Sequence, residues 1–442
     1  MRVFSSKQLS PAGASFSEYR DSINIPVGAN GSIALDITHP TYAPIRARDN
    51  VIIRLPPGPI FSFSPEGLPT YSPPRHRGPP SKEYVPRSLA TITSSTIVTI
   101  NYRLGNLPTN SDNPTDLAFH DYKYPTPVHD TLAGLDWILE TLQPSRLSVI
   151  GTHIGGSLAL MLSLTEAKSI HAVAALEPIC DWTSLDEHCI QSPPTDEKAA
   201  LTSWRNKKHP RGRVAPWDLP PLLAARKAYF STPERYFDAF ASPILFLRSA
   251  GKDTPRSFPE YYTGPEYPVP VLKAGNASEG EDLLDSLDVY RHEEQESTHD
   301  SYSKDSETKR EPPRRRKAIS RWPPFGLDYG TSGPTWHHPG QGIKRLEMEL
   351  PWVRISTRVD DSLSKSGLLM AAPGARKWKR VHTDSVLYQQ AHEMVDVMQR
   401  ACFWGREKGY GQKRVTLTQF LEHDWTLSHH RAADWLREVM MN

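Results

Sequence analysis

The sequence has little cysteine, and its cysteines are not arranged for cross-linking or for metal binding. Its 442 residues contain three of them, Cys180, Cys189 and Cys402, with neither a paired framework nor a close Cys-x-x-Cys spacing. Such usage is typical of a protein that keeps its thiols reduced in a reducing compartment. We therefore expect free thiols, and the sequence indicates no metal site and no cofactor.

Long apolar runs are absent, and the net charge is small. No stretch of about eighteen uncharged apolar residues occurs, and the opening segment, MRVFSSKQLSPAGASFSEYR, has no apolar run of signal-peptide length. The 52 Lys and Arg against 50 Asp and Glu leave a formal charge of +2, which gives no global reason to bind nucleic acid or a membrane. We expect a cytoplasmic protein with no membrane span and no nucleic-acid partner. The sequence leaves its oligomeric state open.

Proline and charge are abundant in segments that we expect outside the core. Many of the 41 prolines fall in loop-like stretches such as LPPGPI and WDLPPLL. Residues 276–324 are polar and charged, so this insertion is predicted to be disordered. It ends in a basic cluster at residues 309–317, which suggests either a nuclear-import or polyanion patch, or simply a solvated segment whose acidic and basic halves attract each other.

Strand and helix patterns alternate on both sides of this insertion. Two alternating runs flank Asn30-Gly31, which is a strong hairpin signal. Short apolar runs typical of a buried parallel sheet follow at residues 51–55, 96–102, 147–151, 172–176, 243–248 and 415–421. Helical spacing appears at 129–142, after residue 153, at 384–404 and from residue 428. The pattern predicts a doubly wound, mostly parallel α/β fold with an N-terminal antiparallel hairpin.

The same patterns suggest how the chain is divided. We expect a tail at residues 1–20, a core at 21–275, the disordered charged insertion at 276–324, and the remaining core at 325–442. Residues 180–240 interrupt the sheet pattern and carry five aromatic residues of interest, Trp182, Trp204, Trp217, Tyr229 and Tyr236. They suggest a helical lid over an apolar pocket, although aromatic packing without a ligand would look the same.

One short stretch has the outline of a catalytic turn. In VIGTHIGGSLA, residues 149–159, an apolar strand pattern meets a helix through Gly-x-His-x-Gly-Gly, with His153 at the centre. In an open parallel sheet the loops after the carboxyl ends of the strands form the reactive crevice. Loops after three predicted strands carry His153, Asp253 and His423, so we expect these side chains to lie in one neighbourhood.

These segments together resemble a known fold. The chain is similar to the α/β-hydrolase superfamily, and most similar to its hormone-sensitive-lipase-like esterase branch, the α/β hydrolase fold-3 type, including degenerate fungal members. The resemblance covers about residues 20–275 and 342–441 and is carried by IVTINYRL, YPTPVHDTLAGLDWI, GTHIGGSLA and FASPILFLRSAGKD. It implies carboxylic-ester hydrolysis, with Asp253 at the acid position and His423 at the base position. His153 stands where the family has its nucleophilic serine.

Two departures from the family pattern bear on activity. An imidazole at position 153 attacks only activated esters and would form a labile acyl-imidazole. The family's His-Gly-Gly-Gly loop is replaced by Pro-Pro-Gly-Pro at residues 56–59, where only Gly58 keeps an N–H group. With Ile154 as the other oxyanion donor, the loss of one donor raises the barrier by about 3 kcal/mol.

Other assignments remain open at this point. Glu177 is an alternative acid, because it follows the strand pattern at residues 172–176. Two histidines and a carboxylate also resemble a facial metal triad, but no spacing requires one. Ser157 is expected to bond locally on its helix, and the pairs at 337–338 and 429–430 are interpreted as surface or capping histidines.

The sequence thus favours a catalytically impaired esterase-like protein whose crevice takes a small apolar ester or carboxylic ligand. Two alternatives remain. One is a hydrolase of low or altered activity that uses His153 or a water held near it. The other is an interaction protein that works through the charged insertion.

Overall fold

The structure is a computed structural model, and part of the chain is described. The described residues are 20–28, 31–40, 49–58, 61–63, 69–71, 85–108, 119–191, 215–264, 267–273, 327–328, 344–345, 350–358, 385–403, 406–420 and 425–441. The predicted insertion at 276–324, its basic cluster and His423 lie outside these residues. Disorder of the insertion therefore stays a prediction.

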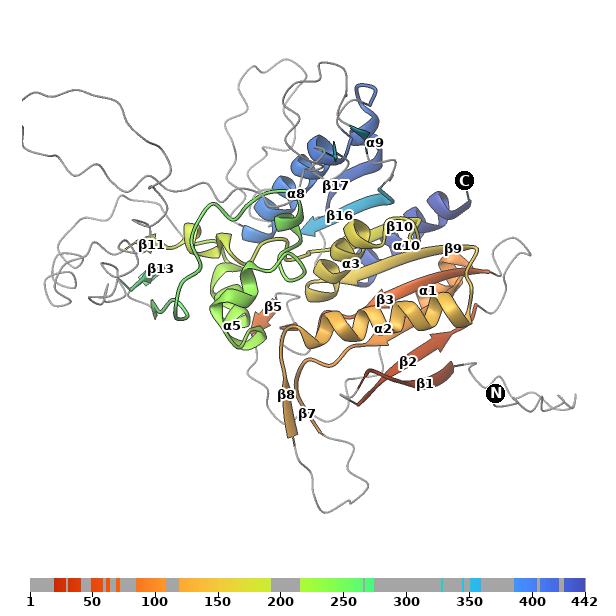
Figure 1. Cartoon of the computed structure of the whole chain (residues 1–442), viewed down its shortest axis with the longest axis horizontal. Coiled ribbons are helices and arrows are strands. Elements are labelled where there is room, and N and C mark those ends of the chain that lie inside the picture. Colours follow the sequence, from red (N-terminus) through yellow and green to blue (C-terminus); the bar gives the residue numbers. More distant parts are fainter. Residues whose placement is uncertain are drawn as a thin grey trace, which may run out of the picture.

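An eight-stranded sheet forms the centre of the molecule, in the order β1-β2-β6-β3-β9-β10-β16-β17 (Figure 1). Its strands are β1 (Arg20–Pro26), β2 (Ser32–Thr38), β3 (Asn50–Leu55), β6 (Thr96–Asn101), β9 (Arg146–Thr152), β10 (Ala172–Leu176), β16 (Trp352–Arg358) and β17 (Val415–Phe420). The pairs β1–β2 and β2–β6 are antiparallel, and each pair from β6 to β17 is parallel. The predicted N-terminal hairpin and mostly parallel sheet are confirmed.

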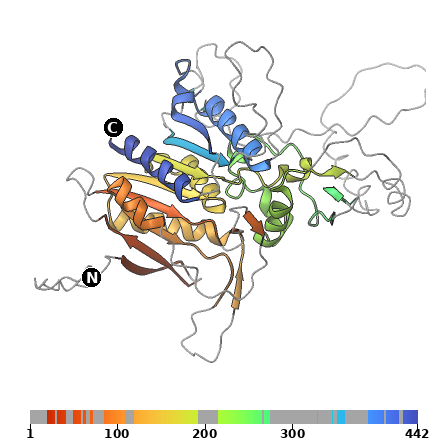
Figure 2. The ribbon, with the colours of Figure 1, turned by 180° about the vertical axis from the view of Figure 1, so that it is seen from behind.

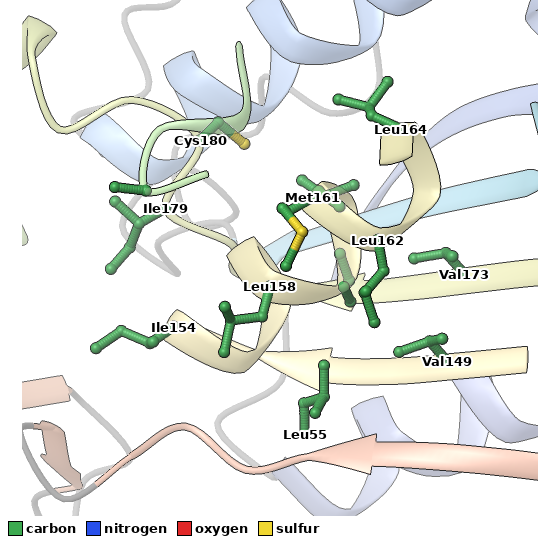
Figure 3. Close-up of a cluster of buried hydrophobic side chains, with 14 of the residues drawn as sticks. Leu55, Val149, Ile154, Leu158, Met161, Leu162, Leu164, Val173, Ile179 and Cys180 are labelled. Carbon is green, nitrogen blue, oxygen red and sulfur yellow. The ribbon is translucent and has the colours of Figure 1, made fainter. Parts of the chain in front are cut away.

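Helices cover both faces of this sheet. One face is covered by α2 (Thr126–Thr141), α3 (Ile154–Thr165) and α8 (Val386–Cys402), and the other by α1 (Val85–Thr93) and α10 (Trp425–Met441), which Figure 2 shows from behind. Side chains alternate along the strands, so Val149 packs in the first layer and Ile150 in the second. Figure 3 shows Leu158 and Leu162 of α3 on the side of the sheet that carries Val149. Two hydrophobic layers therefore enclose the parallel strands, as their unbroken apolar sequences predict.

Shorter elements lie outside the sheet. They are β4 (Phe61–Phe63), β5 (Pro69–Tyr71), β7 (Gly105–Pro108), β8 (Phe119–Tyr122), β11 (Ile190–Gln191), β12 (Tyr261–Gly264), β13 (Tyr267–Leu272), β14 (Leu327–Asp328), β15 (Lys344–Arg345), α5 (Leu219–Tyr229), α9 (Tyr410–Arg414) and the 3-10 helices η2 (Ser184–His188), η3 (Pro233–Phe237) and η4 (Pro243–Phe246). Figure 1 shows α5 beyond the carboxyl ends of the parallel strands.

One strand prediction is wrong. Residues 243–248 were expected to form a strand, but they contain the 3-10 helix η4, whose Pro243 and Ile244 are buried in the core against α3. The sheet position next to β10 is filled instead by β16, whose sequence WVRISTR alternates apolar and polar residues. Burial of an apolar run does not distinguish a strand from a tight helical turn, and Pro243, which has no N–H to donate, fits the first turn of a helix better than a central strand.

The segment that contains α5 is fastened to α8 by a buried carboxylate. Asp218, just before α5, accepts hydrogen bonds from the Ser385 hydroxyl and from the backbone N–H groups of Val386 and Leu387, each at 2.9 Å. The first N–H groups of a helix have no partner within it, so this carboxylate satisfies part of the α8 amino terminus. Side chains that precede and follow the predicted insertion are thereby joined.

A second buried carboxylate connects the sheet to α2. Asp130 of α2 is fully buried and accepts hydrogen bonds from the Arg103 backbone N–H at 2.8 Å, from Nε at 3.0 Å and from Nη2 at 2.7 Å. Arg103 follows β6 closely, so the pair fixes the carboxyl end of that strand to the helix. A bidentate guanidinium–carboxylate contact of this kind depends on both partners, because either charge alone is costly to bury.

We therefore expect Asp130→Ala to lower the free energy of unfolding by about 3–5 kcal/mol, because it leaves Arg103 buried without its counter-charge. Urea denaturation measures this loss. In the control Asp121→Ala, an exposed contact with Lys123 at 3.2 Å is removed, and the loss should stay below about 1 kcal/mol. Equal losses in the two variants would contradict a special role for the buried pair.

Candidate functional site

A sharp turn between β9 and α3 places His153 at the carboxyl edge of the sheet. His153 has φ 48° and ψ −111°, a left-handed conformation that is rare for residues other than glycine. The flanking glycines permit the turn: a Cβ on Gly151 would lie 2.1 Å from the carbonyl oxygen of Gly155, and a Cβ on Gly155 would lie 2.3 Å from that of Leu55. The strand, turn and helix thus have the geometry of a nucleophile elbow with an imidazole at its apex.

The imidazole of His153 is buried and neutral. The residue is 1% exposed, and its Nδ1 lies 3.2 Å from the carbonyl oxygen of Glu177. Burial lowers the pKa of His153 to about 3, and the positive charge of Arg358 acts in the same direction. Because a carbonyl oxygen only accepts hydrogen bonds, Nδ1 must carry the proton and Nε2 must hold the lone pair.

Glu177 and Arg358 complete a buried cluster with His153, which we call the His–Glu–Arg cluster. One carboxylate oxygen of Glu177, Oε1, accepts the backbone N–H of Arg358 at 3.3 Å and lies 3.4 Å from its Nε. The other, Oε2, lies 3.9 Å from His153 Nε2. The Glu177 and Arg358 side chains are 2% and 4% exposed. Burial raises the pKa of Glu177 to about 7, although Arg358 opposes the shift.

The strand register explains why these residues meet. Thr152 of β9 is paired with Leu176 of β10, and Leu176 is paired with Ser356 of β16. The next residues of the first two strands, His153 and Glu177, both have positive φ, which turns the chain out of the sheet at the same level. The three carboxyl ends therefore bring an imidazole, a carboxyl group and a guanidinium to one edge.

The loop after β3 is poor in hydrogen-bond donors. Pro56 and Pro57 have no N–H group, and Gly58 adopts φ 82°. The Tyr102 hydroxyl donates to the carbonyl oxygen of Pro56. The carbonyl oxygens of Leu55 and Pro56 both approach Gly155 in the first turn of α3. This side of the elbow thus presents acceptors, whereas an oxyanion hole requires donors.

The structure does not bring all the predicted site residues together. Ile154 is the first residue of α3 and is buried beside His153. Asp253 is exposed in the segment after η4, rather than after a strand of the sheet, and His423 lies outside the described residues. Glu177, the alternative acid, is the predicted carboxyl group that contacts His153. In the sequence Asp360 and Asp361 follow β16, a strand that was not predicted, and they too lie outside the described residues.

His429 was interpreted as a surface or capping histidine, and this is wrong. It lies inside α10, is 8% exposed, and its Nε2 is 3.3 Å from the Thr152 hydroxyl oxygen, directly before the elbow. The sequence signal for this burial is helical spacing: His429 precedes the buried Ala432, Ala433 and Leu436 by three, four and seven residues. This histidine belongs to the helix face that packs on the sheet.

Ser157 bonds locally, as the sequence suggests. Its hydroxyl donates to the carbonyl oxygen of Ile179 at 2.6 Å and to that of His153 at 3.1 Å, and it accepts the Ile179 N–H at 3.0 Å. The hydroxyl is therefore used in holding α3 to the chain after β10. The three cysteines are buried free thiols. Among the described residues no group of His, Cys, Asp and Glu could hold a metal ion, and no helix is long and apolar enough to cross a membrane.

The order of the strands decides the fold. Numbered along the chain, the eight strands of the sheet lie in the order 1-2-4-3-5-6-7-8, with the first strand and the second antiparallel to their neighbours and the elbow after the fifth. The chain has an α/β-hydrolase fold. The fold implied by the sequence resemblance is thereby confirmed, and His153 lies in the turn after the fifth strand.

Comparisons with known proteins give distant structural likenesses. The chain is similar to carboxyl esterase 2 from the mycorrhizal fungus Tuber melanosporum, with 12% identity, 98% of this chain and 89% of that chain covered, and a TM-score of 0.44. It is also similar to an esterase of Pyrobaculum calidifontis, with 13% identity, coverage of 95% and 84%, and a TM-score of 0.41. For brefeldin A esterase, a bacterial homologue of human hormone sensitive lipase, the identity is 16%, the coverage 56% and 62%, and the TM-score 0.33. No protein-family model and no curated protein matches the chain.

The titration of Glu177 gives a test of the His–Glu–Arg cluster. Its pKa is raised from 4.5 to about 7 in the folded chain, so its contribution to stability is fully present below pH 4.5 and is lost as the pH rises through 7. Glu177→Gln removes this loss. From pH 5 to pH 8 the free energy of unfolding of Glu177→Gln should therefore rise relative to wild type, by roughly 2–3 kcal/mol.

Urea denaturation at each pH measures the difference between the two proteins. His153, whose lowered pKa makes stability fall as the pH drops from 6.5 towards 3, is present in both and cancels from the comparison. Glu140→Gln, on the exposed side of α2, is the matched control and should follow wild type throughout. A Glu177→Gln curve parallel to wild type would show that the buried carboxyl group does not titrate as proposed.

Proposed function

We propose that this chain is an α/β-hydrolase-fold protein that has lost ester hydrolysis and, where it takes a ligand, binds a small apolar ester or carboxylic acid without turnover. The observation that carries the proposal is the state of His153. It is the apex residue of the elbow, it is buried, and its ring nitrogens face protein groups rather than solvent.

Acyl transfer needs a nucleophile that can reach a carbonyl carbon. Nδ1 of His153 is engaged by the Glu177 carbonyl, and Nε2 faces the Glu177 carboxyl group. An acyl group on either nitrogen would require the ring to leave this position and would expose the Glu177 and Arg358 pair. The site therefore opposes covalent chemistry through both its residue type and its packing.

Transition-state stabilisation is opposed as well. Two donors usually hold the oxyanion, and the removal of one costs about 2.7–4 kcal/mol. Here the loop after β3 contributes prolines and carbonyl oxygens near the elbow. Even a reactive nucleophile at position 153 would meet this second barrier.

The ligand part of the proposal is supported by the sequence resemblance. Aromatic side chains of the predicted lid, including Trp182, Tyr229, Phe230 and Tyr236, pack edge to face or tilted against one another. This favours aromatic packing for that part of the lid, so a ligand would have to bind beside this cluster. The interaction alternative concerns the insertion at 276–324, outside the described residues.

We expect wild type and His153→Ala to hydrolyse short nitrophenyl esters at the same rate, within twofold, because the imidazole is not a catalytic residue. Initial rates at equal protein concentration measure this, with heat-unfolded protein as the background. A serine-reactive fluorophosphonate probe should leave the wild type unlabelled. Brisk wild-type turnover that is lost in His153→Ala, or a covalent acyl adduct on the protein, would sink the proposal and favour the active hydrolase.

His153→Ser, with and without Pro57→Gly, distinguishes the effect of the nucleophile on ester hydrolysis from the effect of the oxyanion donors. We expect His153→Ser alone to give little turnover, and His153→Ser combined with Pro57→Gly to exceed it by about a hundredfold, the usual value of one donor. The same ester assay measures both, with Pro57→Gly alone as the control. If His153→Ser alone reaches the rate of the double variant, the proline loop is not a barrier.

A further inference from the structure

We propose that a hollow between β16 and α10 is a binding site for a small organic molecule that carries a phosphate or carboxylate group. The hollow measures about 490 Å³ and is lined by Arg354, Arg431, Asp434, Trp435, Arg437 and Glu438. Its size is within the range of small-molecule sites, which is about 300–1,000 Å³. It exceeds what a single ion would fill.

The lining residues come together because of the side-chain spacing along β16 and α10. Val353 and Ile355 of β16 point into the layer that contains α3 and α8, so Arg354 between them points to the opposite face, towards α10. On α10, residues 431, 434, 435 and 438 share one side at helical spacing, while Ala432 and Leu436 are buried against the sheet. Figure 2 shows α10 lying along this back face of the sheet. The hollow is therefore on the opposite face from α3 and does not depend on the proposed function.

The charges of the lining favour an anion. Three arginines face two carboxylates, and Arg437 is paired with Asp434 at 3.2 Å. Arg354 lies with its Cζ 4.7 Å from the centre of the Trp435 ring, and its buried Nε has no hydrogen-bond partner among the described residues. Half-burial of Arg354 lowers its pKa, a sign that its charge is incompletely compensated; Glu438 opposes the shift.

A guanidinium held over an indole ring is well suited to oxyanion recognition. Its planar donors match two oxygens of a phosphate or carboxylate group, and Lys would not provide this fork. The cation–π contact with Trp435 limits the rotamers of Arg354, so less side-chain entropy is lost when a ligand binds. An anion in the hollow would also compensate the buried charge. The organic part of the ligand would occupy the remaining volume beside the aromatic ring.

Isothermal titration calorimetry of the full chain with phenyl phosphate, inorganic phosphate, benzoate and the neutral benzyl alcohol tests the site. We expect saturable binding of phenyl phosphate or benzoate to wild type, with benzyl alcohol silent, and a loss of at least tenfold in affinity in Arg354→Gln. The stronger of the two aromatic anions identifies the charged group. Inorganic phosphate should bind more weakly than phenyl phosphate, because it leaves the apolar part of the hollow empty.

Two controls keep the test decisive. Arg406→Gln removes an arginine that lies over Tyr410 at 5.4 Å, away from the hollow, and should bind like wild type. Arg431→Gln changes an exposed lining residue, so it tests the site even if Arg354→Gln does not fold, and should weaken binding severalfold. The site would be overturned if wild type showed no saturable binding in the millimolar range, or if the Arg354→Gln and Arg431→Gln variants both bound as tightly as wild type. His153→Ala should bind like wild type, which separates this proposal from the one on the elbow.

Discussion

The contact between His153 and Glu177 is the interaction on which the buried cluster at the carboxyl edge of the sheet depends. The two residues end neighbouring parallel strands in left-handed conformations, and the ring of one donates to the backbone carbonyl of the other. The carboxyl group of Glu177 then holds the end of β16 through Arg358. The contact with the carbonyl oxygen sets the tautomer of the imidazole, burial keeps the ring uncharged, and Glu177 joins three strand ends in a single buried cluster.

This arrangement turns an exposed chemical position into an interior one. An elbow usually holds its apex side chain out to solvent under backbone strain, where the side chain is available for attack. Here the same backbone strain is retained, but the side chain is part of the packing. The loop after β3 presents carbonyl oxygens to the first turn of α3, whereas binding of an anion there would require N–H donors. The backbone geometry of an elbow is therefore present here together with a buried side chain at its apex.

Much of the framework could be predicted from the sequence because its signals are local. Asn30-Gly31 between alternating runs predicts a hairpin, the apolar runs around β9 predict buried strands, and the glycines of the elbow predict a tight turn. β16 was missed because its partly alternating sequence is weaker than the apolar run of η4, and the loop with Asp253 therefore follows a 3-10 helix rather than a strand of the sheet. Glu177 was named only as an alternative, because its contact depends on pairing across three strands. Burial of His429 depends on which side of α10 faces the sheet. The adjacent pair His429-His430 does not show which of the two histidines lies on that side.

The hydrogen bonds of Asp218 have a consequence for the integrity of the molecule. They join the segment before α5 to the start of α8, and β16 lies between β10 and β17, so the parts before residue 274 and after residue 349 share one core. Covalent continuity between the two parts is then not needed to hold them in register. A protease cut within 276–324 would leave two fragments that remain assembled as a nicked whole.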